Sequence, residues 1–111
     1  MNPRSIFSHV FGGTDGDFKE RMERYASMMS EVVKKLRESG FKVRYHDGNY
    51  ACKVELDGIY ELSVSYPLTS GILETYLFKE GTFCHEKGYH DGPKDMITVE
   101  SVIEEIKRLE T

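Results

Sequence analysis

The fold is decided by residues 41–67, which read FKVRYHDGNYACKVELDGIYELSVSYP. Apolar and polar side chains alternate along this stretch, which is the pattern of strands with one buried face. Asp47-Gly48 and Asp57-Gly58 are typical hairpin turns that divide it into three strands. A two-residue turn at Asp47-Gly48 predicts three cross-strand pairs. They are Tyr45 with Tyr50, Val43 with Cys52, and Phe41 with Val54.

The second turn cannot be a simple two-residue one. It would place Val54 opposite Glu61, against the apolar pattern of both strands. A bulge or three-residue loop around 57–59 instead sets apolar residues opposite one another. The pairs predicted in this way are Leu56 with Tyr60, Val54 with Leu62, and Cys52 with Val64.

Two further strands are expected after Pro67 and a loop at 68–71. They run over about 72–79 and 82–87 and are joined by a turn at Glu80-Gly81. Residues 88–95 are rich in glycine, proline and aspartate, which indicates a loop. The predicted pairs are Phe78 with Phe83, Tyr76 with His85, Glu74 with Lys87 and, on the opposite face, Leu77 with Cys84.

Helices are expected on both sides of this sheet. A long one starts at Thr14 or Asp15 and ends at Gly40, with an apolar stripe at spacings of three and four. A second starts after the cap Thr98, and residues 3–11 can form a further short helix. The expected fold is α+β: a five-stranded antiparallel β-meander with the long N-terminal and the C-terminal helix packed on one face. The stripe of the long helix comprises Phe18, Met22, Tyr25, Met29, Val33 and Leu36.

Length and charge limit the function classes. The 111 residues predict one domain, residues 1–111, and no apolar run approaches the roughly 20 residues of a membrane span. The net charge of -4 is spread among interleaved acidic and basic residues, so nucleic acid is an unexpected partner. With no signal peptide in residues 1–11 and only two cysteines, we expect a cytoplasmic protein with buried free thiols.

Candidate reactive side chains do not combine into a site. Cys84 and His85 are neighbours in a predicted strand, so they point to opposite faces, and with His90 and Asp91 they match no standard zinc spacing. We therefore expect no catalytic residues, no metal and no cofactor. Tyr-His-Asp-Gly occurs at both 45–48 and 89–92, which we interpret as turn chemistry.

The sharpest functional signal is an aromatic group on the sheet face away from the helices. Tyr76, Phe78, Phe83 and His85 are predicted to share that face, where four rings are unusual for a surface in water. Either residues 1–11 cover them or a partner does.

A binding protein is the function that this face favours: an inhibitor, adaptor or immunity-type protein that binds a macromolecule through its sheet and the edge strand 82–87. The partner is another protein or a second copy in a homodimer, with self-association favoured by the free edge. The alternatives are a small-ligand or metal-binding protein that uses the loop 85–91 and, third, a small enzyme of unknown class.

Overall fold

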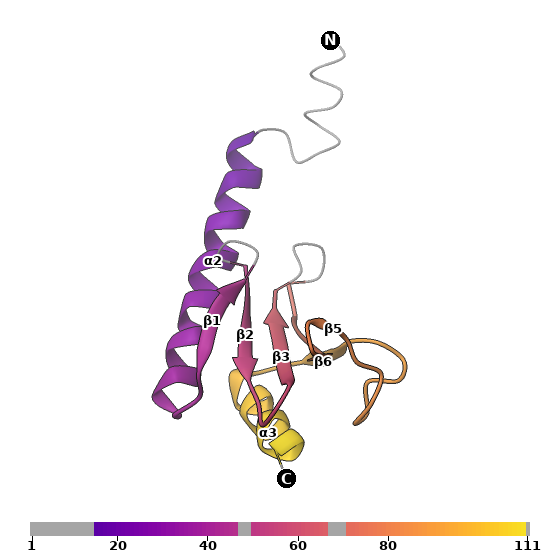
Figure 1. Ribbon diagram of the computed structural model, residues 1–111. Coiled ribbons are helices and arrows are strands. Elements are labelled where there is room, and N and C mark those ends of the chain that lie inside the picture. Colours follow the sequence, from indigo (N-terminus) through magenta and orange to yellow (C-terminus); the bar gives the residue numbers. More distant parts are fainter. Residues whose placement is uncertain (1–14, 47–49, 67–70, 111) are drawn as a thin grey trace.

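The computed structural model describes residues 15–46, 50–66 and 71–110 (Figure 1). These residues contain two helices, α2 (Asp15–Glu38) and α3 (Val99–Glu110), and six strands. The strands are β1 (Val43–His46), β2 (Ala51–Glu55), β3 (Tyr60–Ser65), β4 (Leu73–Lys79), β5 (Thr82–Phe83) and β6 (Lys94–Met96).

All six strands form one antiparallel sheet. Its order is β1-β2-β3-β4-β5, and β6 pairs with the other end of β4. The predicted α+β fold, a five-stranded meander between an N-terminal and a C-terminal helix, is confirmed, and β6 is an addition to it. The short helix predicted at 3–11 and the turn at Asp47-Gly48 lie outside the described residues.

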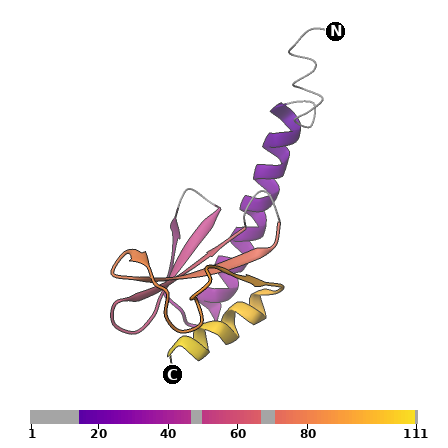
Figure 2. The ribbon, with the colours of Figure 1, turned by 90° about the vertical axis from the view of Figure 1, so that its right-hand side faces the viewer.

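Both helices lie on one side of the sheet (Figure 2). The helix α2 packs on β1 and β2, α3 packs on β6, and the two helices touch each other. Side chains from the helices and from alternate positions of β2, β3 and β4 make up the core. Its fully buried members include Met29, Leu36, Cys52, Val54, Leu62, Val64, Leu77, Tyr89, Val102 and Ile106.

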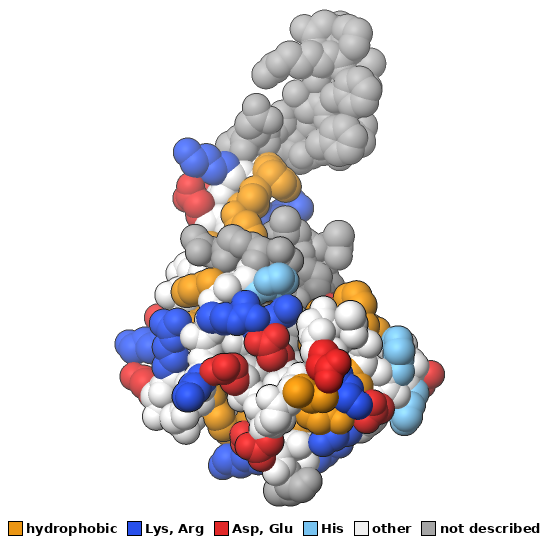
Figure 3. Space-filling model, viewed as in Figure 1, with side chains coloured by type: hydrophobic (Ala, Val, Ile, Leu, Met, Phe, Trp, Pro, Cys, Tyr) orange, Lys and Arg blue, Asp and Glu red, His pale blue; other side chains and the backbone are white. Residues whose placement is uncertain are grey.

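Only the C-terminal half of α2 belongs to this core. Met29, Val33 and Leu36 are buried, whereas Phe18 near the start of the predicted stripe is 51% exposed. The N-terminal half extends beyond the sheet, and hydrophobic side chains are visible on its surface (Figure 3). The helix ends at Glu38, and the predicted stop Gly40 follows it with a φ of +94°, a conformation that glycine adopts at little cost.

The hairpin of β1 and β2 has a different register from the predicted one. Val43 lies opposite Val54, and Tyr45 lies opposite Cys52, so the prediction was wrong by two residues. A shift of two leaves every side chain on its own face, and alternation therefore cannot distinguish the two registers. The end of α2 adds a constraint, because Arg37 Nη2 donates a hydrogen bond to the Val43 carbonyl over 2.9 Å.

The other two hairpins have the predicted registers. Val54 lies opposite Leu62 across β2 and β3, and Phe78 lies opposite Phe83 across β4 and β5. The turn between β4 and β5 uses Glu80 and Gly81, both with positive φ, which suits the twist of a tight hairpin.

The fifth strand is much shorter than the predicted 82–87. After Thr82 and Phe83, the Cys84 N–H still donates to the Leu77 carbonyl, and then the chain leaves the sheet. A turn follows, with Lys87 at a φ of +55°. The predicted pairs of Tyr76 with His85 and of Glu74 with Lys87 were therefore wrong. The chain returns as β6, which takes the place beside 73–75.

Candidate functional site

A hollow lies on the sheet face turned away from the helices, which we call the outer face. It has a volume of about 550 Å³ and is lined by residues from β1 to β5 and from the segment before β6. We call it the outer-face hollow. Its lining residues are His46, Ala51, Ser63, Ser65, Glu74, Tyr76, Phe78, Phe83 and Pro93.

Three aromatic rings form one side of the hollow. The Tyr76 and Phe83 ring centroids are 4.4 Å apart, and those of Phe78 and Phe83 are 4.7 Å apart, with tilted planes in both pairs. Tilted contacts at these distances are favourable for aromatic pairs. Phe83 is nevertheless 58% exposed. We call Tyr76, Phe78 and Phe83 the aromatic wall, and the structure brings these three predicted binding residues together.

His85, the fourth predicted binding residue, is not in the hollow. It is exposed and follows Cys84, the last residue that hydrogen-bonds to β4 on this side. Because the strand ends there, the alternation that would have placed His85 beside Tyr76 does not continue. Pro93 lines the hollow instead, and the sequence pattern gave no sign of it.

Small side chains form the floor of the hollow. The strand register places Ser63 between Lys53 and Tyr76, and Ser65 between Ala51 and Glu74. The side chains of Ser63, Ser65 and Ala51 are too short to fill the space beside the larger Tyr76 and Glu74. The depression therefore follows from the side-chain sizes along β3.

Charges of both signs lie across the outer face (Figure 3). Arg44 pairs with Glu61 at 2.8 Å. Lys53 is only 8% exposed, and its Nζ lies 4.3 Å from the centre of the Phe78 ring. A buried lysine over an aromatic face is a cation–π contact, so one ring of the aromatic wall already interacts with a positive charge of the chain itself.

A buried polar cluster connects α3 to the segment between β5 and β6. Glu105, 8% exposed, accepts hydrogen bonds from Tyr89 Oη at 2.6 Å and from Arg108 Nε and Nη2 at 2.7 Å each. Lys94 Nζ lies 3.3 Å from the same carboxylate, and Tyr89 Oη is 2.9 Å from Thr75 Oγ1.

The electrostatics of this cluster favour an ionised Glu105. Burial acts to raise the pKa of Glu105, but the hydrogen bonds from Arg108 and Tyr89 and the charges of Arg108 and Lys94 outweigh it and hold this pKa at about 2. Burial raises the pKa of Tyr89, with a contribution from its hydrogen bond to Glu105. This arrangement anchors the loop that carries Pro93 to the core.

Sequence reasoning missed this cluster. The Tyr-His-Asp-Gly motif at 89–92 indicates a turn, yet the Tyr89 side chain is fully buried, and its ring stacks with a centroid 6.3 Å from that of Tyr76. The one available signal was Glu105, which is one helical turn from both Val102 and Leu109 on the apolar side of α3. A carboxylate in that position requires a buried partner.

The reactive side chains stay apart in the structure. His85, His90 and Asp91 are exposed, and within 15–46, 50–66 and 71–110 no three His, Cys, Asp or Glu side chains gather as metal ligands. Burial raises the pKa of the Cys52 thiol to about 12, which disfavours a nucleophilic thiolate.

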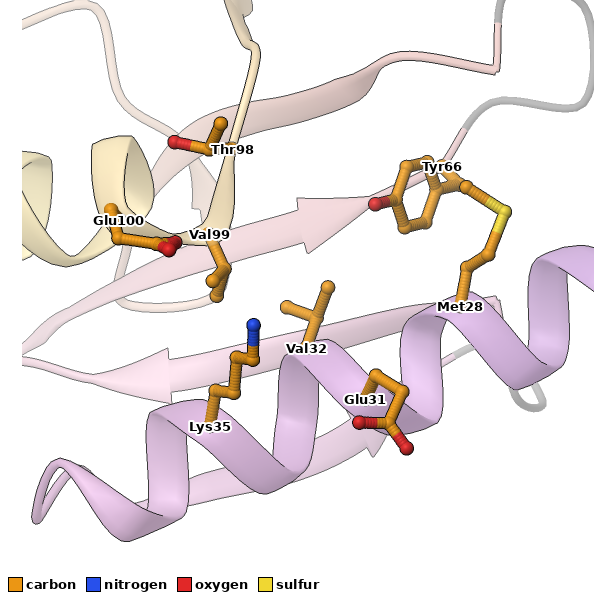
Figure 4. A pocket seen from close by; sticks show the side chains of 8 residues that line it. All are labelled: Met28, Glu31, Val32, Lys35, Tyr66, Thr98, Val99 and Glu100. Atoms are coloured by element: carbon orange, nitrogen blue, oxygen red, sulfur yellow. The ribbon is translucent and has the colours of Figure 1, made fainter.

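A second hollow lies between the two helices (Figure 4). Its volume is about 340 Å³, and Val32 of α2 and Val99 of α3 form an apolar floor. Lys35 extends from α2 towards the start of α3, and Met28 points towards Tyr66 (Figure 4). We call this the interhelical groove.

Comparison of the chain with protein-family models, with curated proteins and with solved structures finds no match. Among the helical residues that the structure describes, none forms a helix long and apolar enough to cross a membrane.

Proposed function

We propose that the chain is a small non-enzymatic binding protein, of the inhibitor, adaptor or immunity type, and that the outer-face hollow binds a protein partner. The observation that carries this proposal is the aromatic wall, with Phe83 58% exposed, beside a floor of small residues. Exposed aromatic side chains in a depression are the usual anchors of protein interfaces. We also propose a reducing compartment such as the cytoplasm, which the buried free thiols of Cys52 and Cys84 support.

The shape of the hollow favours a macromolecule over a small molecule. Its lining comes from five strands and from the segment that leads into β6, so it is broad. Pockets for small ligands enclose most of the ligand surface, whereas a broad open depression receives side chains from another folded surface.

The experiment compares Phe83→Ala with Phe18→Ala, because both residues are exposed phenylalanines and only Phe83 lies in the hollow. Each variant and the wild type are immobilised and incubated with extract of the native host, and retained proteins are quantified by mass spectrometry. The next step is to purify any partner that binds to the wild type and to Phe18→Ala but not to Phe83→Ala. Titration calorimetry should show a loss of about 2 kcal/mol or more in binding free energy for Phe83→Ala.

Sedimentation velocity of the same three proteins tests whether the partner is a second copy of the chain. A wild-type dimer that Phe83→Ala converts to monomer identifies the outer face as a homodimer interface. If Phe83→Ala stays dimeric and retains every protein that the wild type retains, the hollow is not the binding site.

A further inference from the structure

Two acidic residues occupy opposed positions of neighbouring strands at one end of the outer-face hollow. Glu74, which lines the hollow, lies directly opposite Asp95 across β4 and β6. Opposed residues of an antiparallel pair share a face, and like charges in this position repel each other. In the part of the chain that the structure describes, no cation forms an ion pair with either carboxylate. A positive group from outside the chain would relieve this repulsion.

The aromatic wall begins next to these carboxylates. Glu74 and Tyr76 occupy the same face of β4, and the Tyr76 ring packs on Phe83. Faces of aromatic rings attract cations, and the contact of Lys53 with Phe78 is an example on this very surface. Phe83, with more than half of its surface exposed, remains accessible to a cation of another molecule.

We propose that the outer-face hollow receives an arginine side chain of the protein partner, an inference that rests on the function proposed above. The planar guanidinium stacks on aromatic rings and donates paired hydrogen bonds to a carboxylate, which a lysine ammonium does not do. Glu74 is the acceptor, Asp95 adds negative charge, and the aromatic wall supplies the stacking surface. The hydroxyls of Ser63 and Ser65 border the path of the extended side chain.

The test is a ¹H–¹⁵N NMR titration of the whole chain with N-acetyl-arginine amide. The matched probe is N-acetyl-citrulline amide, which has nearly the same shape and no charge. The arginine probe should shift the amide signals of Glu74, Tyr76 and Phe83, with binding that weakens as salt is added. The citrulline probe should bind at least about tenfold more weakly, which is the effect of losing about 1.4 kcal/mol. Equal binding of the two probes would overturn the inference.

Variants locate the charge that the probe recognises. Glu74→Gln should weaken binding of the arginine probe at least about fivefold, as expected when a charge-assisted hydrogen bond becomes a neutral one. Glu104→Gln on the exposed side of α3 is the control and should bind like the wild type. Because Glu74→Gln also removes the repulsion with Asp95, the variant should unfold at the same or a higher urea concentration. Unchanged probe binding by Glu74→Gln contradicts the inference.

A third probe separates this inference from the proposed function. If N-acetyl-phenylalanine amide shifts the signals of the aromatic wall and the arginine probe does not, the hollow binds apolar groups and the arginine inference fails alone. If the arginine probe shifts signals only around the interhelical groove, the inference also fails. The partner experiment with Phe83→Ala then decides the proposed function by itself.

Discussion

Replacing Glu105 by glutamine tests the buried polar cluster that anchors the loop beside the hollow. The carboxylate accepts three hydrogen bonds of 2.6–2.7 Å, from Tyr89 and twice from Arg108. Its pKa is about 2, against an ordinary value of 4.5. A difference of this size corresponds to about 3 kcal/mol of stability, since each pKa unit is worth about 1.4 kcal/mol. Arg108 is 45% exposed, so solvent screening makes this an upper figure.

The sign of the pH dependence follows from the direction of the shift. The folded state holds the pKa of Glu105 below its unfolded value, so the stabilisation is complete above about pH 4.5 and is lost as the pH falls towards about 2. Glu105→Gln removes this contribution. We therefore expect the variant to be about 2–3 kcal/mol less stable at pH 7 and to lose less stability than the wild type between pH 4.5 and 2.

The assay is urea denaturation followed by circular dichroism at several pH values. Glu104→Gln is the control, because Glu104 is the exposed neighbour on the same helix and its loss should change stability by less than about 0.5 kcal/mol. The comparison of the two variants cancels the general effect of removing one negative charge. A Glu105→Gln variant as stable as the control, or with the pH slope of the wild type, would refute this account of the cluster.

Three further substitutions have defined outcomes. Val54→Asp places a carboxylate at a fully buried position of β2 and should leave a chain without a cooperative thermal transition in circular dichroism. Tyr89→Phe removes the hydroxyl between Thr75 and Glu105 and should cost about 1–2 kcal/mol in urea denaturation, whereas no loss would mean that the hydroxyl is dispensable. Gly71→Ala should lower the melting temperature, because Gly71 has a φ of +69° and a Cβ there would lie 2.8 Å from Tyr25 Oη; an unchanged value would contradict the local geometry.

The architecture could be predicted because local signals determine it. Apolar alternation and the Asp57-Gly58 and Glu80-Gly81 turns define strands whose neighbours along the chain are also neighbours in the sheet. The register of β1 and β2 could not be obtained in this way, since two registers that differ by two residues bury the same side chains. The contact between Arg37 and Val43 that helps to hold β1 exists only in the folded chain.

Local signals also determine the positions of three residues of the candidate site. Tyr76, Phe78 and Phe83 lie next to a tight turn, where alternation and turn geometry determine the face of each side chain. His85 was misplaced and Tyr89 was missed, because the segment after Cys84 leaves the sheet and packs through tertiary contacts with α3. Long-range hydrogen bonds of this kind leave no periodic pattern in a sequence.

The most direct test of the proposed function is hydroxyl-radical footprinting of aromatic side chains in the complex with the partner that the wild type retains. Phe83 and Phe18 are 58% and 51% exposed in the free chain, so both should be oxidised readily without the partner. With the partner bound, oxidation of Phe83 and Tyr76 should fall several-fold, and oxidation of Phe18 should stay unchanged. Protection of Phe18 or of Met28 in the interhelical groove, with Phe83 still fully reactive, would contradict binding at the outer face.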